Sequence, residues 1–155
     1  MAERLPIDAI LKRGEGKVVR GRGICLLPAS DHFRYVFDAA IWPAMKKAGV
    51  EGRSIEICFD SDSGLAEVVG AIASAEVIVA ELSTLNADVM YVLGLCHGIG
   101  RWPILIMHRG AEPPFGMGEM GRIEYETGPR GMHELRENLK RAVRRVLAMG
   151  RGEAK

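Results

Sequence analysis

Residues 77–100 constrain the fold more than any other part of the chain. They begin with Val-Ile-Val-Ala, a β-branched run typical of a buried strand, and end with an apolar stretch at 87–99 that has the length of a helix. The polar residues Glu81, Ser83 and Asn86 lie between the two. In α/β domains the carboxyl end of a central strand presents polar side chains in this way, so we expect the functional site at this turn.

The rest of the chain alternates between strand and helix patterns. The expected strands are residues 23–28, 54–60, 77–81, 102–107 and 122–125, and the expected helices are 33–48, 65–75, 87–99 and 132–149. This alternation, with right-handed crossovers, predicts a single-domain three-layer α/β sandwich whose five-stranded, mainly parallel sheet has the order 2-1-3-4-5. We expect residues 1–20 to form an N-terminal extension and residues 21–150 to form the domain.

Two features refine this arrangement. Pro43 lies inside the helical pattern of residues 33–48, so we expect it to bend or restart that helix. In the order 2-1-3-4-5, the loops after the first and third strands flank one crevice, which places the turns at 29–32 and 82–86 together.

The composition excludes several classes of protein. A hydrophobic fraction of 48% with 26% charged residues is ordinary for a globular domain, and no apolar run approaches the ~20 residues of a membrane span. The net charge of +1 gives no electrostatic case for a nucleic acid polymer. The first residues lack the plan of a signal peptide. We therefore expect a cytoplasmic protein that binds neither a membrane nor a nucleic acid polymer.

The cysteines and glycines indicate neither a metal site nor a cofactor. Cys25, Cys58 and Cys96 lie singly in apolar segments, so buried free thiols are expected rather than disulfides or a zinc site. The glycine-rich stretches match neither a dinucleotide fingerprint nor a phosphate-binding loop.

Several motifs occur in an order that resembles the nucleoside 2-deoxyribosyltransferase-like superfamily, which is related to the TIR fold. The central resemblance is to a strand ending in Ala-Asp-Leu-Ser, followed by Asn-Pro-Asn-Val-Phe-Tyr-Glu-Leu-Gly and a His. The matching elements span about residues 23–147 and are Leu26-Leu27-Pro28, Phe33, Tyr35, Ile41-Trp42-Pro43-Ala44, Ala80-Glu81-Leu82-Ser83, Asn86 to Gly94, His97, Pro103 to Ile106 and Pro114-Phe115.

The resemblance implies chemistry at an N-glycosidic bond, with one departure. In catalytic members the Glu before Leu-Gly attacks the sugar, because a carboxylate stabilises an oxocarbenium-like transition state and then holds the sugar covalently. Here that position is Val92, whose side chain can do neither. Two other carboxylates remain candidates for catalysis. Glu81 replaces the family Asp, and Asp88, four residues before Val92, shares its helix face or simply favours the helix dipole.

Further residues are candidates for ligand binding by the same resemblance, and most have an ordinary structural alternative. Ser30 contacts a sugar or phosphate or caps a helix, Asn86 orients a ligand or caps its helix, and Asp60 lies near a ribose or is a loop carboxylate. His108 is an acid or a loop histidine without a function. The complete set of expected ligand-binding residues is Pro28, Ser30, Asp60, Ser83, Asn86 and Val92.

These observations predict a nucleoside- or nucleotide-binding domain and leave its activity open. The chain cleaves or transfers at an N-glycosidic bond through Glu81 or Asp88, or it is a catalytically silent nucleotide sensor or assembly module. A TIR-like NAD-cleaving signalling domain is a further alternative. Relatives commonly form homo-oligomers, and the apolar helix expected at 87–99 suits a subunit interface.

Overall fold

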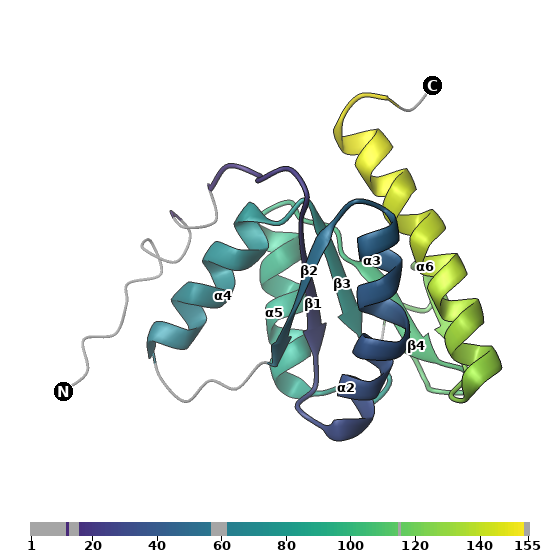
Figure 1. The fold of residues 1–155 in the computed structure, drawn as a ribbon. Coiled ribbons are helices and arrows are strands. Elements are labelled where there is room, and N and C mark those ends of the chain that lie inside the picture. Colours follow the sequence, from purple (N-terminus) through teal and green to yellow (C-terminus); the bar gives the residue numbers. More distant parts are fainter. Residues whose placement is uncertain (1–11, 13–15, 57–61, 115, 154–155) are drawn as a thin grey trace.

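The computed structural model describes residues 12, 16–56, 62–114 and 116–153. Its five strands form one sheet in the order β2-β1-β3-β4-β5, and every neighbouring pair is parallel (Figure 1). This confirms the predicted fold class and strand order. The strands are β1 Arg22–Leu27, β2 Glu51–Glu56, β3 Val77–Glu81, β4 Ile104–His108 and β5 Arg122–Tyr125. The helices are α2 Asp31–Val36, the π-helix η1 Phe37–Ile41, α3 Trp42–Lys47, α4 Asp62–Ser74, α5 Ala87–Gly98 and α6 Pro129–Gly150.

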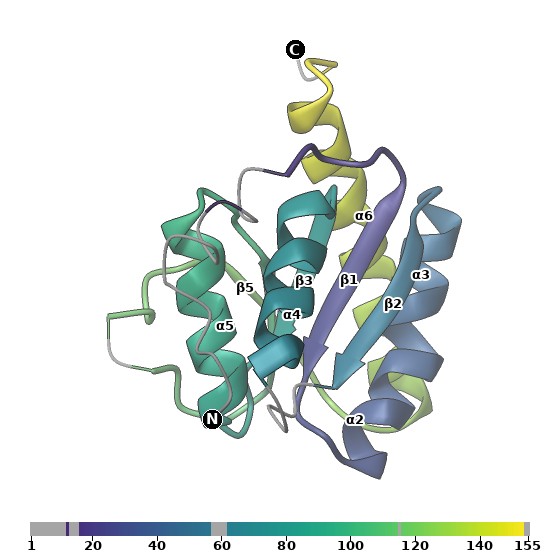
Figure 2. The same ribbon diagram turned by 90° about the vertical axis from the view of Figure 1, so that its left-hand side faces the viewer.

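Helices cover both faces of the sheet. Figures 1 and 2 show α4 and α5 on one face and α2, α3 and α6 on the other. Alternate side chains of β3 point to the two covered faces. Val77 and Val79 pack in the cluster under α3 and α6, whereas Ile78 and Ala80 pack in the cluster under α4 and α5. A strand that is buried on both faces produces the continuous apolar run seen in the sequence. No helix in the described part of the chain is both long and apolar enough to cross a membrane.

Two glycines allow α3 to approach the sheet. Gly23 of β1 is the register partner of Gly52 of β2. An added Cβ at Gly52 would lie 2.4 Å from Sδ of Met45, and one at Gly23 would lie 2.5 Å from Val50 Cγ1 and 3.2 Å from the same sulfur. The fully buried Met45 side chain therefore fills the space left by a glycine pair across two strands.

The second strand begins at Glu51, three residues earlier than predicted. Its first residues, Glu51 to Arg53, pair through their backbones with Arg22 to Ile24 of β1. Pairing at a sheet edge needs only backbone groups, so this polar segment has no apolar pattern to reveal it. The predicted continuation at 57–60 lies outside the described residues, as do Asp60 and Cys58.

The segment predicted as one helix at 33–48 is built from three pieces. The π-helix η1 separates α2 from α3, and the Trp42 N–H bonds to the carbonyl of Phe37, five residues earlier. Pro43 lies in the first turn of α3, where a missing N–H is tolerated. The predicted restart at Pro43 is therefore confirmed.

Arg136 of α6 compensates for Pro43. In a regular α-helix the N–H of residue 43 would bond to the carbonyl of Ala39, and proline has no such group. The guanidinium of Arg136 donates to this oxygen instead, from Nη2 at 2.8 Å and from Nε at 3.3 Å. This arginine of the charged α6 row thus joins two helices.

We expect Arg136→Met to lower the free energy of unfolding by about 1.5 kcal/mol, because a charge-assisted bond to a partly buried carbonyl is lost. Urea denaturation would measure the change. Arg145→Met on the same helix is the control, since Arg145 is exposed and a surface substitution is expected to change stability by less than about 0.5 kcal/mol. Equal effects of the two substitutions would contradict the capping role of Arg136.

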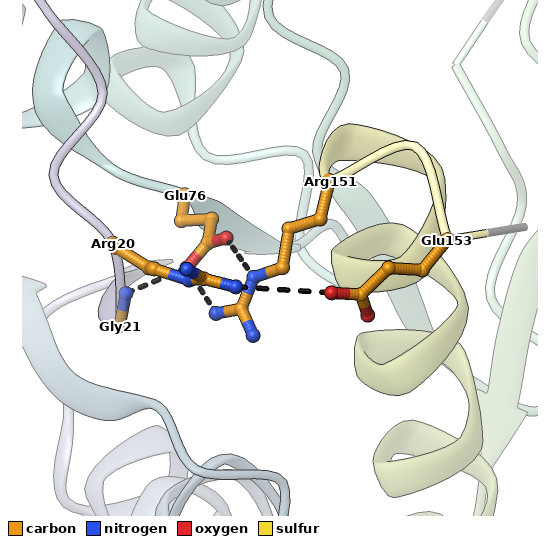
Figure 3. A network of polar contacts seen from close by, with 5 residues as sticks. All are labelled: Arg20, Gly21, Glu76, Arg151 and Glu153. Atoms are coloured by element: carbon orange, nitrogen blue, oxygen red, sulfur yellow. Dashed lines mark hydrogen bonds and ion pairs between the residues drawn. The ribbon is translucent and has the colours of Figure 1, made fainter.

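Ion pairs join residues near the two ends of the described fold (Figure 3). They lie at the side of the sheet where the strands begin. The Glu76 carboxylate accepts from Arg151 Nε at 2.7 Å and Nη2 at 2.8 Å, and from the Gly21 N–H at 2.6 Å. Arg20 and Glu153 approach to 3.8 Å beside them. The end of α6 is therefore linked to the residues that begin β1 and β3, on the edge opposite the candidate site.

Candidate functional site

The connections that follow the neighbouring strands β1 and β3 lead to opposite faces of the sheet. The loop after β1 leads to α2 on one face, and the loop after the neighbouring β3 leads to α5 on the other. In open α/β sheets, ligands bind at the carboxyl ends of strands where the connections diverge in this way. The turns after these two strands therefore form the candidate site.

Two of the predicted ligand-binding residues cap helices in this structure. Ser30 Oγ accepts from the Phe33 N–H at 3.3 Å and caps α2. Asn86 Oδ1 accepts from the N–H groups of Asp88 at 3.0 Å and Val89 at 3.1 Å and caps α5. Each residue therefore has the capping role that was the alternative to ligand binding. Both caps lie at the starts of helices beside the site. Pro28 lies buried directly after β1.

Glu81 is the central polar residue of this edge. Its side chain is only 1% exposed. Oε1 accepts from the Tyr125 hydroxyl at 3.0 Å and from the Ser83 hydroxyl, and Oε2 accepts from the Ser83 N–H at 3.1 Å. The Ser83 oxygen also accepts from the His108 N–H at 2.7 Å. One carboxylate therefore connects the carboxyl ends of β3, β4 and β5.

Burial controls the protonation of this cluster. It raises the pKa of Glu81, although hydrogen bonds from Ser83 and Tyr125 act in the opposite direction. Burial and then the Glu81 charge raise the pKa of Tyr125, so its phenol remains a donor. The same two causes, in the same order, raise the pKa of the buried Cys25 thiol. Burial therefore opposes ionisation of all three side chains, Glu81, Tyr125 and Cys25.

Sequence reasoning missed Tyr125 as a member of this cluster. Tyr125 ends β5, and its register partner is His108 at the end of β4. Their rings meet edge to face, with centroids 5.7 Å apart. Its position at the end of a predicted strand could have indicated its role, since in a parallel sheet the last residues of adjacent strands lie at one edge.

Glu81 and Val92, the position of the family nucleophile, lie on opposite faces of the sheet. Its partner Tyr125 belongs to the apolar cluster under α3 and α6, whereas Val92 is fully buried in the cluster under α4 and α5. Asp88 is half-buried in the first turn of α5. The sheet therefore separates the side chains of Glu81 and Val92.

The turn between β3 and α5 carries local strain. Leu85 has φ of 49°, a left-handed conformation that a leucine rarely adopts, and its side chain is 43% exposed. Its N–H bonds to the Leu82 carbonyl at 3.2 Å. Strained turns of this kind are concentrated at ligand-binding segments, and this one lies beside Ser83 at the predicted edge.

The described residues contain no group of three or more His, Cys, Asp or Glu side chains that is placed to hold a metal ion. Cys25 and Cys96 are buried free thiols, as predicted. Burial raises the pKa of Cys96 to about 12. Neither thiol is therefore a nucleophile at neutral pH.

Comparison of the chain with protein-family models, curated proteins and solved structures gave no match.

Proposed function

We propose that this protein binds a nucleoside or nucleotide at the turns after β1 and β3 and leaves its N-glycosidic bond intact. The position of the site is supported by the divergence of the connections and by the strained turn at Leu85. The class of ligand rests on the resemblance of these turns to the deoxyribosyltransferase-like pattern.

The burial of Val92 is the observation that supports the absence of cleavage. The transition state at the sugar carbon needs a carboxylate in contact with it. Val92 is 0% exposed inside an apolar cluster, so a carboxylate at this position would have to be buried there. Both oxygens of Glu81 already accept hydrogen bonds, and its side chain is 1% exposed. Of the two candidate carboxylates, Glu81 and Asp88, Asp88 is the one that remains, which makes it the residue to test for residual activity.

A ligand screen tests both parts of the proposal. We expect a nucleoside or nucleoside monophosphate to raise the melting temperature saturably, corresponding to about 2.7 kcal/mol when its concentration reaches a hundred times the dissociation constant. Chromatography of the same mixtures should show no free base. The panel consists of deoxynucleosides, nucleoside monophosphates and NAD.

Two variants locate the binding site. Thr84→Arg places a large charged side chain on the exposed turn after β3 and should reduce the thermal shift. Met149→Arg, 65% exposed at the far end of α6, is the matched control and should leave the shift unchanged. The absence of a shift with every ligand would refute binding. If the protein released free base, and Asp88→Asn or Glu81→Gln abolished this release, the proposal that the N-glycosidic bond stays intact would be refuted. Nicotinamide release from NAD would favour the TIR-like alternative.

A further inference from the structure

The last turn of α4, residues 73–76, joins three separate segments of the chain. Its backbone carbonyls accept from the Val19 N–H at 2.8 Å and from Arg101 Nη2 at 2.5 Å. Its Glu76 carboxylate holds Arg151 at the end of α6 (Figure 3). The segments that lead into β1 and β4 therefore meet the end of α6 at the side of the sheet opposite the candidate site. Residues 17–22, 73–76, 101–102 and 149–153 are called the amino-edge surface below.

Exposed apolar side chains concentrate on this surface. Trp102 is 69% exposed and Met149 is 65% exposed, which makes them the two most exposed large apolar side chains in the described chain. Val18 and Val19 are each 42% exposed. His97 packs against the Trp102 ring, with ring centroids 4.8 Å apart, so this indole is held in place. A single exposed apolar side chain is ordinary, whereas several on one surface indicate an interaction site.

The same surface is more positive than the chain as a whole. Five cations and two carboxylates give it a net charge of +3, whereas the whole chain has a net charge of +1. The cations are Lys17, Arg20, Arg22, Arg101 and Arg151, and the carboxylates are Glu76 and Glu153. Both carboxylates pair with arginines of the surface itself. Lys17, Arg22 and Arg101 form no ion pair with any described residue, so their charges are available to a partner.

The ends of three helices reduce this charge without cancelling it. The carboxyl ends of α4, α5 and α6 lie at this side of the sheet (Figure 1), and each carries about half a negative elementary charge. Together they offset roughly half of the net positive charge of the amino-edge surface. The surface therefore attracts an anionic partner.

Cationic and apolar side chains are mixed within each segment of this surface. Residues 17–20 read Lys-Val-Val-Arg, residues 101–102 read Arg-Trp, and residues 149–151 read Met-Gly-Arg. The core of a protein–protein interface is depleted in charged residues, so this mixture does not suit one. The phosphate backbone of a nucleic acid would pair with the cations but would leave the valines and the methionine without a partner. An anionic lipid bilayer accepts both kinds of side chain, because its interfacial region takes up Trp and aliphatic groups while its head groups attract Lys and Arg.

We propose that the amino-edge surface binds an anionic lipid bilayer, with Trp102, Met149 and the two valines in the interfacial region and the cations against the head groups. Each cation near such a bilayer should raise the partition coefficient about five-fold. The binding should be reversible and should weaken as salt screens the charges. The composition predicted no membrane binding, because total charge and apolar runs do not reveal a surface that is assembled from four separate segments.

Co-sedimentation of the full chain with lipid vesicles tests this surface. We expect binding to phosphatidylcholine vesicles that contain about one third phosphatidylserine, and little binding to pure phosphatidylcholine. Lys17→Glu should lower the partition coefficient about thirty-fold, because it changes the local charge by two units. Arg130→Glu is the matched control. It makes the same change in total charge at the other end of α6, about 30 Å along the helix and beyond the screening length of ~10 Å, so the partition coefficient should not change.

Tryptophan fluorescence tests which part of the surface enters the bilayer. The chain has two tryptophans, so each can be observed alone. In Trp42→Phe, the remaining Trp102 should shift its emission to shorter wavelength on anionic vesicles, because its indole leaves water. In Trp102→Phe, the remaining Trp42 on α3 should show no shift.

Three results would overturn the proposal. They are an absence of binding to anionic vesicles at low salt, equal weakening by Lys17→Glu and Arg130→Glu, and an emission shift from Trp42 rather than from Trp102. If the chain bound a single-stranded oligonucleotide through Lys17 and bound no vesicle, the surface would be a nucleic-acid site instead. The measurements need no nucleoside, so their outcome is separate from that of the proposed nucleotide binding.

Discussion

Gly131→Ala is expected to lower the free energy of unfolding by about 3 kcal/mol, the upper part of the range for overpacked sites. A Cβ at Gly131 would lie 1.9 Å from the carbonyl oxygen of Glu126 and 2.6 Å from its carbonyl carbon. Both atoms belong to the backbone, so no rotation of a side chain relieves the clash. The start of α6 must move, which disturbs the buried Met132 and Leu135 beside it.

Thermal or urea denaturation measures this loss, and we expect the melting temperature to fall by roughly 9 °C for a domain of this size. Gly70→Ala on α4 is the matched control. Its Cβ would meet nothing within 4 Å, so the better helix propensity of alanine should stabilise the protein by about 0.5 to 1 kcal/mol. If both substitutions destabilise the protein equally, the clash is not the cause.

Glu81→Ala is expected to destabilise the protein by about 3 kcal/mol at pH 5, as for a large-to-small substitution in a core. The variant leaves a cavity and removes the acceptor for the hydroxyls of Tyr125 and Ser83. Buried donors without partners add the cost of their lost hydration. Tyr125→Phe keeps the ring and removes one donor, so its cost should be about 1 kcal/mol. A larger loss in Tyr125→Phe than in Glu81→Ala would contradict this account.

The pH dependence of stability should identify Glu81 by its sign. Burial raises the pKa of Glu81 above its unfolded value of about 4.3. Its contribution to stability is therefore fully present below pH ~4.3 and is lost as the pH rises through the folded pKa. Relative to Glu81→Gln, the wild-type protein should lose stability across this window by at most about 1.4 kcal/mol per pH unit. Urea denaturation of both proteins at several pH values tests this, and a constant difference between them would contradict it.

Glu76 supplies a control of opposite sign for this experiment. The hydrogen bond from Arg151 lowers the pKa of Glu76. Its contribution is present above the unfolded pKa and is lost as the pH falls through the folded pKa. Relative to Glu76→Gln, the wild-type protein should therefore gain stability as the pH rises.

The sequence alone determined the order of the sheet and the position of its central strand. Residues 77–81 and 122–125 are strands with the predicted bounds, and the first four strands alternate with helices along the described chain. These properties follow from patterns that repeat every two or four residues, so they can be recognised within one segment. Chain connectivity and the right-handed crossover rule then leave few ways to arrange the strands.

Only the tertiary structure decided which polar groups meet. The bond from Tyr125 to Glu81 joins residues 44 apart, and the bond from Arg136 to the Ala39 carbonyl joins residues 97 apart. Neither partner carries a local signal of the other, because each bond depends on the position of a separate element after folding. Val92 was recognisable in the sequence as a departure from a pattern, but its burial under α5, on the face of the sheet away from Tyr125, was decided by the packing of the two helical layers.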